Sequence, residues 1–159
     1  MTAATASRVM DTLLVPYDFT SESRAAFEQA ERLARLADAT IHLLHVVHPP
    51  MLHAVTPAGP LDLALPEVVV TGALLEAKEL LLQVAEGSEA EVEVHVVEGL
   101  PTDAICTFAE RLDADLIVMG THGRAGLGHL LHGSVTERTL RRAPCPVLTV
   151  RAPVDSSAP

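Results

Sequence analysis

The feature that most constrains the fold of this chain is the alternation of short apolar runs with longer segments whose apolar residues recur at helical spacing. We predict strands at residues 12–15, 41–47, 92–96, 116–119 and 147–150, and helices at 21–38, 67–86, 101–112 and 134–142. Strands that alternate with helices pair in parallel through right-handed crossovers, which place helices on both faces of the sheet. The sequence therefore predicts a single-domain α/β fold with a doubly wound, five-stranded parallel sheet.

Two segments depart from this regular pattern. In residues 92–96, valines alternate with Glu93 and His95, which is typical of a strand with one wetter face at the edge of a sheet. Residues 48–66 contain five prolines and one glycine and show no steady period. We expect a long connection there, of the kind that is often functional or mobile.

The charge balance limits the partners of the chain. Its 159 residues fit one domain and carry a formal net charge of −10, with Lys78 as the single lysine. Nucleic acids and anionic membranes both attract clustered lysine and arginine, so the sequence argues against either as a partner. A bound phosphate would have to be held by backbone N–H groups, a helix end, a few arginines and a divalent cation.

The ends of the chain and its cysteines indicate where the protein works. Residues 1–9 lack the apolar core of a signal peptide, and no stretch approaches the roughly 18 uninterrupted apolar residues of a membrane span. Cys106 and Cys145 lie in apolar stretches, which fits reduced core residues in a reducing compartment. We expect a cytoplasmic protein with a flexible N-terminus at 1–9, a folded domain at 10–151 and a disordered tail at 152–159.

A glycine-rich loop follows the fourth expected strand and leads into the last helix. Ser134 and Glu137 have capping-box spacing, which locates the start of that helix and makes its first N–H groups a site for an anion. Gly120, Gly123 and Gly133 would let the backbone approach a phosphate without a Cβ clash. The loop is neither a Walker A motif nor a Gly-x-Gly-x-x-Gly fingerprint, so by itself it also fits a simple turn before a helix.

Other polar residues beside the expected carboxyl ends of the strands have more than one interpretation. Asp18 directly follows the first strand, where it can contact a ligand or simply favour the dipole of the first helix. Thr20 or Ser21 is the expected N-cap of that helix. Arg124 and Arg138 can add charge-assisted hydrogen bonds to a phosphate.

The histidines raise the question of a metal site. Three lie in the glycine-rich loop, namely His122, His129 and His132. A polar loop is the favoured interpretation of these three, because no nearby cysteine or acidic side chain completes a ligand set. Three others lie on expected strands, where we predict structural or exposed roles: His42, His45 and His95.

The spacing of Gly120, Gly123, Gly133 and Ser134 resembles the nucleotide-binding signature of the universal stress protein family, in its ATP-binding branch. The likeness covers residues 10–151 and includes the first, second and last expected strands. It implies the strand order 3-2-1-4-5, which also puts the alternating valine strand at an edge. It further implies ATP, ADP or AMP as ligand, with Mg²⁺ or Mn²⁺, and a homodimer formed through the last strand by Val147, Leu148, Thr149 and Val150.

The same resemblance implies which residues contact the nucleotide. Asp18 and the backbone around Pro16 and Val46 would hold the adenosine, with Tyr17 in the same turn. Met119 and Gly120 would line the wall of the pocket. The phosphates would be held by Gly123, Gly133, Ser134 and Val135, with His122 and Arg124 in the same loop.

We therefore expect an adenine-nucleotide-binding stress-response or regulatory homodimer, whose ligand adjusts a loop or the dimer. The sequence shows no positioned general base, since neither Asp18 nor the loop histidines have an evident partner. Two alternatives stay open. A slow ATP hydrolase or phosphoryl-transfer enzyme would use the same loop with His122 orienting water, and a dimeric scaffold would bind no nucleotide.

Overall fold

A computed structural model describes residues 10–48, 51–56, 59–64, 67–121 and 135–152. The N-terminus expected to be flexible, 1–9, and all but the first residue of the expected disordered tail, 152–159, lie outside the described residues. The main sheet contains β1 (Thr12–Pro16), β2 (Thr40–Val47), β5 (Val92–Glu98), β6 (Leu116–Gly120) and β7 (Val147–Val150). The helices are α1 (Ser21–Ala37), α2 (Glu67–Glu86), α3 (Pro101–Leu112) and α4 (Val135–Arg142).

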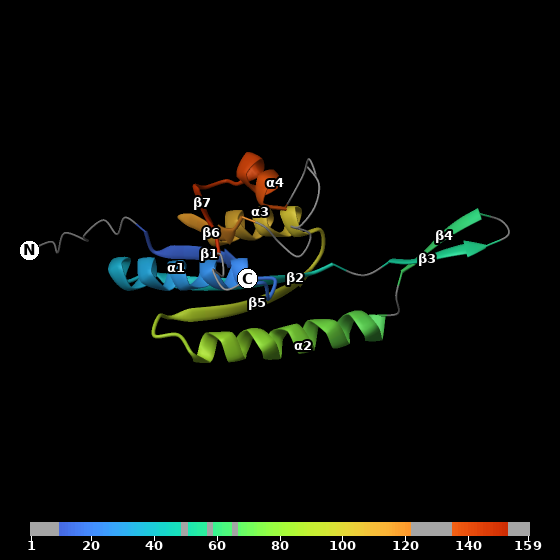
Figure 1. The fold of residues 1–159 in the computed structure, drawn as a ribbon, viewed down its shortest axis with the longest axis horizontal. Helices are drawn as coiled ribbons and strands as arrows, with labels where there is room; N and C mark the ends of the chain where they lie inside the picture. The colour runs from blue at the N-terminus through green and yellow to red at the C-terminus, as the bar shows by residue number, and fades with distance from the viewer. Residues whose placement is uncertain (1–9, 49–50, 57–58, 65–66, 122–134, 153–159) are drawn as a thin grey trace, which may run out of the picture.

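The strands of the main sheet are all parallel, in the order β5-β2-β1-β6-β7. Numbered along this sheet alone, that order is 3-2-1-4-5, so the expected topology is confirmed and β5 lies at an edge. Helices α1 and α2 cover one face and α3 and α4 the other (Figure 1). The fold is the doubly wound α/β architecture that the alternation of elements predicts.

Each face of the sheet has its own apolar core. On the first face, residues of α1 and α2 such as Phe27 and Leu81 pack against Leu13 and Val15 of β1. On the second face, Ile105 of α3 packs with alternate strand residues. This division follows from the pleat of a strand, which turns successive side chains to opposite faces. Within the described residues, no helix is long and apolar enough to cross a membrane.

The connection between β2 and α2 is more regular than we expect from its sequence. It contains β3 (Met51–Thr56) and β4 (Gly59–Ala64), which pair antiparallel as a separate two-stranded sheet. Figure 1 shows this hairpin projecting away from the main sheet. The high proline content of the connection hid this hairpin from the sequence analysis. However, Pro60 is only the second residue of β4, and the other prolines of the connection lie outside both strands.

Candidate functional site

The expected nucleotide site lies where β1 and β6 end side by side. These neighbouring strands lead to opposite edges of the sheet, since β1 is followed by β2 on one side and β6 by β7 on the other. In open α/β sheets, ligands bind outside the carboxyl ends of the strands at such a reversal of strand order. The described part of this edge contains the turn after β1, the end of β6 and the start of α4.

The turn after β1 is organised by Asp18. Its Oδ1 atom accepts hydrogen bonds from the backbone N–H of Thr20 at 3.2 Å and from the Thr20 hydroxyl at 2.5 Å. Thr20 is the N-cap of α1 and forms a capping box with Ser23, which confirms one of the two expected caps. Asp18 therefore stabilises the start of α1, and it does so through a single carboxylate oxygen that accepts both of these bonds.

Tyr17 points toward the face of the sheet that α1 covers. Its ring is buried and lies edge-on to the rings of Phe19 and Phe27, with centroid distances of 5.3 and 6.2 Å. Burial raises the pKa of its hydroxyl above the usual value, although Arg24 acts in the opposite direction. The Tyr17 carbonyl accepts a hydrogen bond from Nδ1 of His45 at 2.7 Å, which ties the turn to β2.

A groove of about 530 Å³ extends from Tyr17 between α1 and α2. Its lining combines apolar residues with charged ones, including Phe19, Arg24, Glu28 and Leu80. The groove lies on the α1 and α2 face. It is therefore distinct from the edge at which the expected phosphate loop begins.

Three of the predicted contact residues lie on the opposite face. Val46, Met119 and Val135 all pack into the apolar cluster beneath α3, and Met119 is buried. The Thr136 hydroxyl donates a hydrogen bond to the carbonyl of Gly120 at 2.8 Å. This bond fixes the first turn of α4 on the carboxyl end of β6.

Gly120 has a packing role that the sequence did not reveal. A Cβ atom at this position would lie 2.7 Å from the Cβ, 2.8 Å from the carbonyl carbon and 2.9 Å from the carbonyl oxygen of Glu22. The start of α1 therefore occupies the space beside Gly120. The absence of a side chain at this position is required by the chain itself, whether or not a phosphate also approaches.

The structure thus brings together Pro16 at the end of β1, Asp18 in the turn after it, Gly120 at the end of β6, and Val135 at the start of α4. The remaining predicted contacts lie outside the described residues: His122, Gly123, Arg124, Gly133 and Ser134.

A second polar cluster lies on the sheet away from this edge. His42 of β2 meets Glu93 and His95 of β5, where we expected only structural or exposed histidines. The signal in the sequence is the pair Glu93 and His95, two residues apart on one strand. It becomes informative only when the pairing of β5 with β2 is known.

Comparison with known proteins agrees with the fold. The sequence profile of the Universal stress protein family matches residues 10–151. Among curated proteins, Universal stress protein MJ0531 of Methanocaldococcus jannaschii is 34% identical over 141 residues, which cover 89% of this chain and 82% of the relative.

Solved structures of the family have the same architecture. The chain superposes on the universal stress protein UspA of Lactobacillus plantarum with a TM-score of 0.68 at 27% identity, covering 89% of this chain and 98% of that one. A family protein of Arabidopsis thaliana, solved with AMP bound, gives 0.59 at 22% identity over 93% and 96% of the two chains. Two further family structures, solved with cAMP and dAMP, give TM-scores of 0.62 and 0.60. Sequence profile, relatives and fold agree, and the chain belongs to the Universal stress protein family.

Proposed function

We propose that this chain binds an adenine nucleotide at the carboxyl edge between β1 and β6, and acts as a nucleotide-binding stress-response or regulatory protein of the cytoplasm. The observation that carries the proposal is the Thr136–Gly120 hydrogen bond, which holds the head of α4 against the end of β6 beside the turn of Asp18. Family structures solved with AMP, cAMP and dAMP support the choice of ligand.

The chemistry of the described residues suits an adenosine. The bonds from Thr20 occupy Oδ1 of Asp18, so Oδ2 is the oxygen proposed to accept a ribose hydroxyl. Val46, which is only partly buried, offers apolar surface against which a base can pack, and Met119 belongs to the same apolar cluster. The N–H groups at the start of α4, together with Gly123, Gly133 and Ser134, are the proposed phosphate contacts.

The proposed form of the ligand is ATP with Mg²⁺ or Mn²⁺. The chain has a formal net charge of −10, so a cation that neutralises the phosphates would reduce repulsion at the site. Within the described residues, no group of three metal-ligating side chains lies at this edge. Phosphate oxygens and bound water would therefore supply most of the ligands of the ion, as is usual for Mg²⁺.

We also propose that two copies pair through β7. The carbonyls of Pro146 and Val150 accept hydrogen bonds from Ile117 of β6 and from Thr121 just after it, so the backbone groups of the alternate residues Val147 and Thr149 point away from the sheet. Among the described strands, none pairs with this outer edge of β7. An exposed strand edge of this kind is suited to pairing with a second copy.

The nucleotide proposal can be tested with one charge-removing substitution and a matched control. Asp18→Asn keeps an oxygen for Thr20 but replaces the other acceptor with an amide. A charge-assisted hydrogen bond contributes about 1.5–3 kcal/mol, so we expect affinity to fall about 10- to 100-fold in calorimetric titrations with ATP, ADP, AMP and cAMP in the presence of Mg²⁺. Asp113→Asn makes the same change at the other end of the strands, after α3, and should bind like the unmodified protein.

Two further outcomes decide the proposal. Gly123→Val and Gly133→Val should abolish binding while the circular dichroism spectrum is retained, because their side chains would occupy the proposed phosphate space. The proposal is wrong if the unmodified protein binds none of the four nucleotides with Mg²⁺ present. It is also wrong if Asp18→Asn and Asp113→Asn bind with equal affinity.

A further inference from the structure

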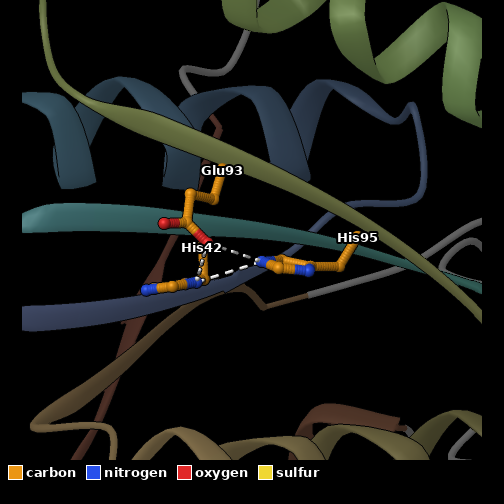
Figure 2. A group of neighbouring side chains, drawn as sticks. All are labelled: His42, Glu93 and His95. Atoms are coloured by element: carbon orange, nitrogen blue, oxygen red, sulfur yellow. Dashed lines mark hydrogen bonds and ion pairs between the residues drawn. The ribbon is translucent and has the colours of Figure 1, made fainter.

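His42, Glu93 and His95 form a compact group that the proposed nucleotide site does not use. Nδ1 of His42 lies 3.0 Å from Nε2 of His95. The Oε2 atom of Glu93 lies 3.5 Å from the first nitrogen and 3.7 Å from the second. Figure 2 shows the two rings and the carboxylate converging on one point between β2 and β5.

The parallel pairing of β2 and β5 creates this group. His42 is paired with Glu93, and Leu44 with His95, so all four side chains face the same side of the sheet. Leu44 belongs to the apolar cluster beneath α3, which identifies that side. Phe108 of α3 packs against the ring of His95 with a centroid distance of 4.8 Å. The His95 ring is thus held between its own strand and the helix above it.

We propose that His42, Glu93 and His95 form a binding site for a divalent transition metal, with Zn²⁺ as the best match, separate from the nucleotide site. Zinc binds nitrogen and carboxylate ligands at about 2.0–2.2 Å in tetrahedral geometry, which requires ligand atoms about 3.3 Å apart. The three observed distances, 3.0, 3.5 and 3.7 Å, lie on both sides of that value. Shifts of a few tenths of an ångström in the ligand atoms, together with rotation of the two rings, whose planes now lie only 19° from parallel, would produce three corners of the tetrahedron.

The environment keeps the ligands in the form that a metal needs. Burial lowers the pKa of His42 and of His95 below the usual value, while the carboxylate of Glu93 acts in the opposite direction. Both imidazoles are therefore neutral at pH 7, and a neutral imidazole is the form that binds a metal ion. In the absence of an ion, the two facing nitrogens must share one proton to lie 3.0 Å apart.

The site is open on one side. The side chain of Glu93 is 56% exposed and that of His42 only 11%, so the group lies between solvent and core. An ion can enter past Glu93, and water can occupy the fourth position of the tetrahedron. This arrangement of three protein ligands and one open position is typical of zinc sites that keep an exchangeable ligand.

Position along the strand separates this site from the nucleotide edge. Val46 follows His42 by four residues on β2, a separation of about 13 Å at the rise of a parallel strand. A bound ion would join the edge strand β5 to β2. Because the two sites are this far apart, the metal proposal does not depend on the proposed nucleotide function.

The test is a titration of the metal-free full-length chain with Zn²⁺ at pH 7.5, monitored by calorimetry and by imidazole nitrogen NMR. We expect one tight ion per chain and selective shifts of the ring nitrogens of His42 and His95. Glu93→Gln and His95→Gln each remove a ligand and should weaken the affinity for Zn²⁺ at least about tenfold. Loss of a group that only supports a metal ligand already weakens affinity by about that factor. Substitution of Co²⁺ should give the visible absorption of a tetrahedral site.

Glu98→Gln is the matched control, because Glu98 is the last residue of β5, is also an exposed glutamate and is not one of the three proposed ligands. It should bind Zn²⁺ as the unmodified chain does. The proposal is overturned if Zn²⁺ shifts only other histidines, or if Glu93→Gln and His95→Gln retain full affinity with their fold intact. A chain that binds no Zn²⁺ at all overturns it as well.

Discussion

At the scale of single residues, Gly120 shows how close packing can require a glycine at a position that is also proposed to contact a ligand. Its α-carbon lies against the first turn of α1, where atoms of Glu22 would be within 3 Å of an added Cβ. Two of these atoms belong to the backbone and cannot rotate away. The glycine is therefore a condition for bringing the start of α1 to the end of β6.

We expect Gly120→Ala to destabilise the fold by about 1–3 kcal/mol, the usual cost of overpacking a close contact. The control is Gly72→Ala in α2, where an added Cβ would meet nothing within 4 Å. That substitution should raise the free energy of unfolding by about 0.5–1 kcal/mol, because alanine favours a helix over glycine. Urea unfolding followed by circular dichroism measures both values, and equal stability of the two variants would contradict the packing argument.

The pair of His42 and His95 gives a second prediction at this scale, for the metal-free protein. Because the pKa values of His42 and His95 are lowered in the folded state, the unfolded chain binds more protons below about pH 6.5. Stability should therefore be fully present above pH 7 and decrease as pH falls from 6.5 toward the folded pKa values. Each histidine contributes a slope of at most about 1.4 kcal/mol per pH unit.

His95→Gln should reduce this slope, because one of the two shifted groups is removed. Urea unfolding of both proteins in EDTA between pH 5 and 8 provides the measurement. The carboxylates that face the pair, Glu91 and Glu93, are present in both proteins and do not affect the comparison. Parallel curves for the two proteins would contradict the interpretation.

At the scale of elements, the turn from β1 into α1 shows how a helix start is fixed. The hydroxyl of Thr20 accepts the N–H of Ser23 at 3.2 Å, and the hydroxyl of Ser23 accepts the N–H of Thr20 at the same distance. Phe19, just before the cap, has a φ of 64°, which lies in the left-handed region. Its ring packs against Tyr17 and His45, and these contacts hold it there.

Removal of this cap should destabilise the protein by about 1 kcal/mol, within the range of about 0.5–2 for threonine caps. Thr20→Ala tests this in thermal and urea unfolding. Ser21→Ala is the control, since the Ser21 hydroxyl bonds the half-buried side chain of Glu22 and takes no part in the capping box of Thr20 and Ser23. Its effect should stay within about 0.5 kcal/mol. A Thr20→Ala variant as stable as Ser21→Ala would show that the cap is not needed.

At the scale of the whole molecule, the sheet has two different edges. On the side of β5 it has the histidine cluster and glutamates, and on the side of β7 it has a short apolar strand. Charged residues at an edge discourage pairing, whereas an apolar edge favours it. The molecule is therefore suited to pair through β7 and not through β5.

Thr149→Pro should convert the proposed dimer to a monomer. Thr149 is exposed and its N–H points away from β6, so proline removes a donor to the second copy without removing a bond within the sheet. Thr149→Val retains the N–H and should remain dimeric. Light scattering after gel filtration distinguishes the outcomes. A monomeric unmodified protein, or a dimeric Thr149→Pro variant, would contradict pairing through β7.

Much of this architecture could be predicted from the sequence, for identifiable reasons. The alternation of runs such as 12–15 and 41–47 with helical stripes determined the elements, and the alternating residues 92–96 correctly indicated an edge strand. The hairpin of β3 and β4 was missed, because prolines in the connection outweighed its two short runs. The local sequence pattern is sufficient to predict an element when that element buries one of its faces in the core.

Features that depend on contacts between distant elements could not be predicted in the same way. The contact of Glu22 with Gly120 and the meeting of His42 with His95 each join segments that only the sheet brings together. For the candidate site, the sequence predicted where α4 begins but not the packing role of Gly120, and the ligand contact of Asp18 stays a prediction. The residues 122–134, which carry most of the predicted phosphate contacts, remain a prediction.

The strand order also has a consequence for biosynthesis. The central strand β1 is the first to leave the ribosome, yet it pairs with β6, whose residues Leu116 and Ile117 are made about a hundred positions later. Until then, one side of Leu13 and Leu14 has no neighbour to pair with. An mRNA truncated before codon 116 would therefore yield a nascent chain in which one apolar edge of β1 is unpaired. Such chains are expected to associate with one another instead of folding.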